Sequence, residues 1–135
     1  MANPSKAKGT AFETAVVTYL REHHDPRAHR NVQMGAKDIG DIDGYHLHAV
    51  EAKAEKTITL ADYVAQANRE AINAGKPYGC AVVKRRMKGT ADAYVVRDLA
   101  TDVRLMNRLR DMEAALKDVS FDLWFDIDEE HREAA

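Results

Sequence analysis

The alternation of apolar and polar positions predicts a succession of helices and short strands. Helical spacing of apolar residues runs from about Lys8 to His23 and again from Thr59 to Gly75. A third helix is expected from about Leu99 to Leu116. Short apolar stretches between these helices predict five strands, at 28–34, within 35–44, and at 45–53, 79–84 and 93–97.

This order, α-β-β-β-α-β-β-α, predicts an α/β fold with a mixed central sheet flanked by helices. A chain of 135 residues suits a single domain, expected here at 1–117. Residues 118–135 form an acidic, aromatic-containing tail. The acids of this tail would repel DNA, so its aromatic residues are more typical of packing, or of a dimer or partner contact, than of base stacking.

Composition and charge narrow the classes of protein that the chain can represent. No stretch approaches the ~20 apolar residues of a membrane span, and the polar N-terminus does not predict a secretory signal. The single cysteine, Cys80, excludes a Cys-based zinc finger and fits a reducing, cytoplasmic setting. Residues 1–97 carry 15 basic and 11 acidic side chains, against 5 and 11 in 98–135. The basic first part leaves a nucleic-acid partner open despite the net charge of −2.

One segment carries candidate chemistry. Glu51 and Lys53 lie two apart on an expected strand and therefore project from the same face. An acid and a lysine at the end of so apolar a strand are costly unless they are paired or hold a cation. Asp41, on the preceding short strand, could supply a second carboxylate. Two converging carboxylates suit Mg²⁺ or Mn²⁺, which can polarise a phosphodiester and activate water, while a lysine orients the water or stabilises the transition state.

These residues resemble a known superfamily. The segments GDIDG, VEAK, QANREAINAGKPYGCAVVKRR and DAYVV are similar to PD-(D/E)XK nucleases, and more narrowly to the small Holliday-junction-resolvase-like nucleases of bacteriophages and actinobacteria. The resemblance covers roughly residues 8–100, with Gly40 where the family usually has proline. It implies a restriction-endonuclease-like α-β-β-β-α-β core. The implied activity is that of a Mg²⁺-dependent deoxyribonuclease that cleaves branched four-way DNA junctions as a homodimer, in the cytoplasm of a bacterial or phage-infected cell.

The resemblance also implies roles for particular residues. Lys53 would be the catalytic lysine, and Gln66 resembles a polar accessory residue that some relatives place near the site. The implied metal ligands are Glu13, Asp41, Glu51 and the main-chain carbonyl of Ala52.

Two of these assignments have competing explanations. Thr10 and Glu13 have the spacing of a capping box, which would need no metal. A helix that begins earlier, near Ser5 or Lys6, would remove the capping role. Asp38 and Asp43 compete with Asp41 for the role of second carboxylate, although either aspartate fits a turn.

Basic and imidazole side chains complete the candidates. The loop with Lys84, Arg85, Arg86 and Lys88 is either a solubilising turn or a grip on DNA phosphates. Further residues that could extend this nucleic-acid-binding surface are Arg30, Lys37 and Lys56. The histidines lack the spacing of a helical zinc motif, and His46 and His48 are expected to share an exposed strand face.

Two alternatives to a junction-cleaving endonuclease remain open. The same site would serve an exonuclease or a nuclease of flapped or single-stranded DNA in recombination or genome processing. A non-catalytic DNA-binding module that retains the fold is the alternative from another class.

Overall fold

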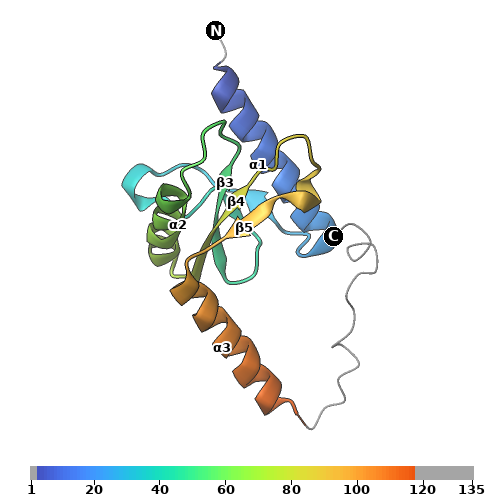
Figure 1. The fold of residues 1–135 in the computed structure, drawn as a ribbon, viewed down its shortest axis with the longest axis vertical. Coiled ribbons are helices and arrows are strands. Elements are labelled where there is room, and N and C mark those ends of the chain that lie inside the picture. The colour runs from blue at the N-terminus through green and yellow to red at the C-terminus, as the bar shows by residue number, and fades with distance from the viewer. Residues whose placement is uncertain (1–2, 118–135) are drawn as a thin grey trace. The chain divides into compact units, whose positions relative to one another are not determined.

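The computed structural model describes residues 3–117 and has an α/β fold with a mixed five-stranded sheet (Figure 1). The described residues divide into two units after Asp102. The expected tail at 118–135 lies outside the described residues. The elements are α1 (Pro4–His23), β1 (His29–Arg30), η1 (Gly35–Lys37), β2 (Ile42–Asp43), β3 (His48–Lys53), α2 (Leu60–Ala74), β4 (Tyr78–Val83), η2 (Thr90–Asp92), β5 (Tyr94–Val96) and α3 (Leu99–Ala115).

The sheet has the strand order β1-β2-β3-β4-β5, and its helices and strands follow the predicted sequence. Only β3 and β4 run parallel, with α2 as their crossover; the other neighbouring pairs are antiparallel. Glu51 is in register with Ala81, and Lys53 with Val83. The prediction of a mixed sheet flanked by helices is therefore confirmed.

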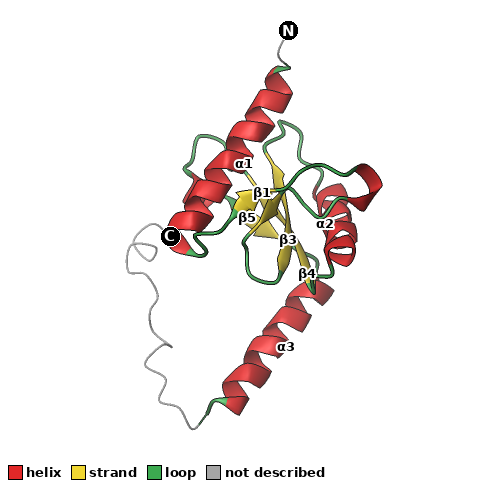
Figure 2. Ribbon diagram, turned by 180° about the vertical axis from the view of Figure 1, so that it is seen from behind, coloured by secondary structure: helices red, strands yellow, loops and turns green. Residues whose placement is uncertain are grey.

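Helices α1 and α2 lie on opposite faces of the sheet (Figure 2). On the α1 side, Val50 and Ala52 of β3 join a core with Phe12 and Val16. The alternating residues of β3 must face α2, where the buried Tyr63 packs against the neighbouring strand β4. This alternation turns both Glu51 and Lys53 toward α2, and the shared face is the one that the sequence predicted.

Helix α1 begins earlier than the expected start near Lys8. The side chain of Asn3 accepts a hydrogen bond of 3.0 Å from the Ser5 N–H, and Pro4 occupies the first helical position. Thr10 therefore lies inside the helix, and the capping box of Thr10 and Glu13 is wrong. Glu13 is left without a capping role.

Two glycines allow close backbone approaches that position the site. A Cβ on Gly79 of β4 would lie 2.5 Å from the carbonyl oxygen of Ala67, so glycine lets β4 pack tightly under α2. Gly40 has φ +100°, and a Cβ there would lie 3.0 Å from the Val50 main chain. Proline fixes φ near −65°, which explains why proline cannot stand at this position.

The expected shared, exposed face for His46 and His48 is wrong. Leu47 has φ +64°, so β3 begins at His48, and His46 lies in the preceding turn. His48 is buried between the rings of Tyr45 and Tyr78, at centroid distances of 4.6 and 5.3 Å. Burial lowers the pKa of His48.

Among residues 3–117, no helix combines the length and apolar character needed to cross a bilayer.

Candidate functional site

Asp41 is fixed beside Glu51 by the backbone of β3. Its N–H donates to the carbonyl oxygen of Val50 at 2.8 Å, and its Oδ2 accepts from the Ala52 N–H at 2.9 Å. These two bonds bracket Glu51 in sequence. The structure therefore brings together the two carboxylates that the sequence singled out.

The side chains of Glu51 and Lys53 meet at the end of β3. The Glu51 side chain is only 2% exposed, and its Oε2 lies 3.4 Å from the Lys53 Nζ. Lys53 also donates to Gln66 Oε1 at 3.2 Å, and its Nζ lies 5.3 Å from the centre of the Tyr63 ring. Gln66, proposed from sequence as an accessory residue, thus contacts the candidate catalytic lysine directly.

Glu70 on α2 is a fourth acidic residue of the site, and the sequence argument missed it. It is buried, and its Oε1 accepts from Gln66 Nε2 at 3.1 Å. The carboxyl groups of Glu70 and Glu51 can share a hydrogen bond only if one of them carries a proton, and such a bond raises the pKa of Glu51. Without that proton, Glu70 Oε2 has no donor among the described residues. The available signal was an acid one helical turn beyond Gln66, on the same face as Tyr63 and Ala67.

The acids raise one another's affinity for protons. Burial, followed by the negative charges of Glu13 and Glu70, raises the pKa of Asp41 to about 6, against the opposing hydrogen bond from Ala52. Burial, the hydrogen bond with Glu70 and the charge of Asp41 raise the pKa of Glu51 to about 10. Lys53 lowers both pKa values but does not offset the burial. The cluster therefore needs protons or a further cation near neutral pH.

Glu13 is paired with a cation from another element. Its Oε2 accepts a hydrogen bond from Arg30 Nε at 2.9 Å and forms an ion pair with Arg30 Nη2 at 2.8 Å. Its charge acts on Asp41. If Glu13 were a metal ligand, its carboxylate would be shared between the metal ion and Arg30. The same pair also occupies the Arg30 guanidinium, which the sequence analysis proposed as a DNA-binding group.

The competing aspartates are engaged elsewhere. Asp43 forms an ion pair with Lys76, which lowers the pKa of its carboxyl group. The carboxylate of Asp38 accepts a hydrogen bond from the Met34 N–H. Asp41 is thus the aspartate that meets Glu51.

The acidic side chains fit a hard divalent cation that takes only two of its ligands from protein carboxylates. Within the part of the chain that the structure describes, no three His, Cys, Asp or Glu side chains form a group that could hold a metal ion. Asp41 and Glu51 can supply two carboxylates, which suits Mg²⁺ because that ion retains several waters and takes further oxygens from a phosphate substrate. The surplus of buried acid also fits a cation.

The basic loop starts beside this site. The Lys84 N–H donates to the carbonyl oxygen of Lys53 at 2.9 Å. Lys84, Arg86 and Lys88 are exposed, and the Arg85 guanidinium lies 5.1 Å from the centre of the Tyr94 ring. The loop can therefore present positive charge next to the acids.

Comparisons of the chain with protein-family models, with curated proteins and with solved structures gave no match.

Proposed function

We propose that this protein is a Mg²⁺-dependent deoxyribonuclease of the PD-(D/E)XK type that cleaves branched DNA, with four-way junctions as the preferred substrate. The observation that carries the proposal is the buried Glu51–Lys53 pair beside Asp41. Burying this many charges is costly, and a structural role in the sheet would be served better by apolar side chains. A cytoplasmic setting is part of the proposal and is supported by the single, unpaired Cys80.

Each residue would have a defined task in phosphodiester hydrolysis. Asp41 and Glu51, with the main-chain carbonyl of Ala52, would hold Mg²⁺, which supplies Lewis acidity and an acidified water when bound. Lys53 would place its ammonium group against the scissile phosphate and stabilise the added negative charge. Gln66 holds that ammonium in position through its 3.2 Å hydrogen bond. Lys84 and its neighbours in the basic loop would bind phosphates of the DNA strand.

A homodimer would supply the two active sites that paired nicks across a junction require. The apolar positions along α3 support this part of the proposal. Leu105, Leu109 and Met112 of α3, with Leu116 immediately after the helix, recur at intervals of four, three and four residues, which is the spacing of a helix–helix seam. In an antiparallel pair of copies, Leu105 would face Leu116 and Leu109 would face Met112, so the seam is self-complementary.

Cleavage assays with matched variants test the proposed activity. A synthetic four-way junction, a flapped duplex and a linear duplex are incubated with Mg²⁺ or with EDTA. We expect the junction to be cut fastest, in Mg²⁺ only. Lys53→Ala should slow cleavage by about 10²–10³-fold, because one electrostatic contact to the transition state is lost. Lys6→Ala, an exposed lysine on α1, serves as the matched control and should cleave normally.

Each result bears on a different part of the proposal. Cleavage that persists in EDTA, or in Lys53→Ala at the wild-type rate, would contradict the mechanism. Preference for flapped or single-stranded DNA would keep the chemistry and replace the substrate. Binding of DNA without metal dependence, unchanged in Glu51→Ala, would favour a non-catalytic DNA-binding module.

A further inference from the structure

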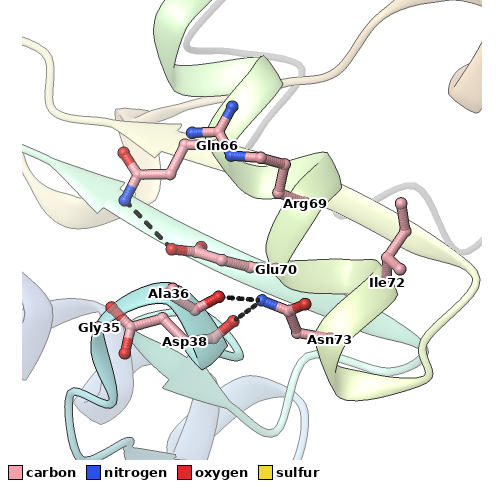
Figure 3. Close-up of a pocket in the computed structure, with 8 residues that line it drawn as sticks. All are labelled: Gly35, Ala36, Asp38, Gln66, Arg69, Glu70, Ile72 and Asn73. Atoms are coloured by element: carbon pink, nitrogen blue, oxygen red, sulfur yellow. Dashed lines mark hydrogen bonds between the residues drawn. The ribbon is translucent and has the colours of Figure 1, made fainter.

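A hollow next to the candidate site lies between η1 and α2 (Figure 3). Its volume is about 380 Å³, within the usual range of small-molecule sites. Gly35, Ala36 and Asp38 form one wall, and residues of α2 form the other. It therefore has room for a group about the size of one nucleotide.

Hydrogen bonds hold the two walls together. The Asn73 side-chain amide donates to the carbonyl oxygens of Ala36 at 3.2 Å and of Asp38 at 2.9 Å. These bonds tie η1 to α2 across more than thirty residues of sequence. The hollow is thus preformed, which lowers the entropic cost of binding a ligand there.

Two residues that line the hollow contact the candidate site. Gln66 and Glu70 line it and also belong to the site, since Gln66 accepts from Lys53 and donates to Glu70. A ligand group that occupies the hollow would therefore lie close to one bound at Lys53. In a DNA strand, that relation holds between a scissile phosphate and the adjoining nucleotide.

Arg69 gives the hollow its chemical preference. Its side chain extends along α2 at the rim of the hollow, it is exposed, and no described residue forms an ion pair or hydrogen bond with its guanidinium (Figure 3). A free guanidinium offers a planar pair of donors that matches phosphate oxygens. The amides of Gln66 and Asn73 are engaged within the protein, and Ile72 is 79% exposed at the same rim.

We infer that this hollow binds one unstacked nucleotide of the DNA strand next to the scissile phosphate, with Arg69 on its phosphate. The inference rests on the proposed nuclease function and deepens it. A nucleotide in a continuous duplex stays stacked, and removing it costs a few kcal/mol, whereas a nucleotide at a branch point or flap is already unpaired or easily released. The hollow would thereby select branched over continuous DNA.

Binding measurements on Arg69→Ala, with Arg108→Ala as the matched loss of an exposed arginine, test this inference. Both variants are made in the Lys53→Ala protein with Mg²⁺, so that DNA is bound and not cut. We expect Arg69→Ala to weaken binding of the junction and the flap about tenfold, and to reduce the slope of log affinity against log salt by about 0.7–0.9, the value of one phosphate contact. Affinity for linear duplex should stay within about twofold. Arg108→Ala should change none of these.

A fluorescent base reports the unstacking itself. With 2-aminopurine at the branch point, emission should rise when the Lys53→Ala protein binds, and the rise should be lost in the double variant with Arg69→Ala at saturating protein. Equal loss of junction and duplex affinity, or behaviour like Arg108→Ala, would overturn the inference while leaving cleavage by the wild-type protein intact. Selective loss of junction binding in a protein that cleaves no DNA would keep the hollow and refute the nuclease. Absence of DNA binding by the wild-type protein would refute both.

Discussion

Burial and neighbouring acids raise the pKa of Asp41 to about 6 and the pKa of Glu51 to about 10, because they disfavour the charged form of each carboxyl group. In an unfolded chain these carboxyls would titrate near 3.8 and 4.5. The folded, metal-free protein therefore holds more protons than the unfolded chain between about pH 4 and 10. The stability that these protonated groups provide is present at low pH and is lost as pH rises through the two folded-state pKa values.

Glu51→Gln should remove the larger part of this pH dependence. In EDTA, the melting temperature of the wild-type protein should fall from about pH 5 to about pH 9. The amide that replaces the carboxyl group carries no charge, so the melting temperature of the variant should fall less over this pH range. At about pH 8 the variant should melt on the order of 5 °C higher than the wild type. At that pH, Mg²⁺ should raise the melting temperature of the wild-type protein and leave the melting temperature of the variant unchanged. Thermal melts across pH give these values.

Glu22→Gln is the matched control, because Glu22 is an exposed acid on α1. Its melting profile should follow the wild-type curve at every pH. A wild-type melting temperature that rises over the same pH range in EDTA would show that Glu51 is ionised in the folded protein without a cation. The cation requirement would then lose its main support.

At the level of elements, the start of α1 is set by Asn3. Its side chain accepts from the Ser5 N–H, so Asn3→Ala should lower the free energy of unfolding by about 0.5–2 kcal/mol. Thr10→Ala should lower it by less than about 0.5 kcal/mol, because Thr10 lies inside the helix, where alanine is favoured. Urea denaturation of both variants checks the comparison. If Thr10→Ala lowered the free energy of unfolding more than Asn3→Ala, Thr10 and not Asn3 would be the residue that caps the helix.

The elements that were predictable from sequence are those that depend on local pattern. The two-residue period of β3 placed Glu51 and Lys53 on one face, and Gly75 marked the end of α2 with φ +64°. The order of apolar strands and helices similarly predicted a mixed sheet flanked by helices. These features follow from neighbours in the chain, and the structure confirms them.

The parts that sequence reasoning missed depend on contacts between distant segments. Glu70 becomes part of the site only because α2 packs on the face of β3 that carries Glu51. The pairing of Glu13 with Arg30 joins α1 to β1. The burial of His48 depends on Leu47, whose φ of +64° cannot be read from a pattern of apolar residues. Each of these requires the tertiary arrangement first.

On the scale of the whole molecule, α3 carries an apolar surface without a described covering. Leu109, Met112 and Leu116 are 50%, 55% and 47% exposed. Helices of this length are marginal in water unless an apolar face is packed. The unpacked seam therefore favours a partner helix, for which a second copy is the occupant proposed above.

Leu109→Asp should convert the proposed dimer to a monomer, because it places a charge at the middle of the seam. Asn107→Asp introduces the same charge on the opposite face of α3 and should leave the dimer intact. Sedimentation velocity at several protein concentrations distinguishes the two states. A wild-type protein that sediments as a monomer at every concentration would remove the dimer, and a Leu109→Asp dimer would place its interface elsewhere.

The reactivity of Cys80 can report on local opening of the central sheet. It is the single cysteine of the chain, it is completely buried in β4, and burial raises the pKa of its thiol to about 12. An alkylating reagent can therefore reach the sulfur only when the centre of the sheet opens. The alkylation rate of the wild-type chain, followed by mass spectrometry, should thus measure the opening equilibrium without any added label. If alkylation is slower in Mg²⁺ than in EDTA, the ratio of the two rates gives the amount by which a bound cation stabilises the closed sheet.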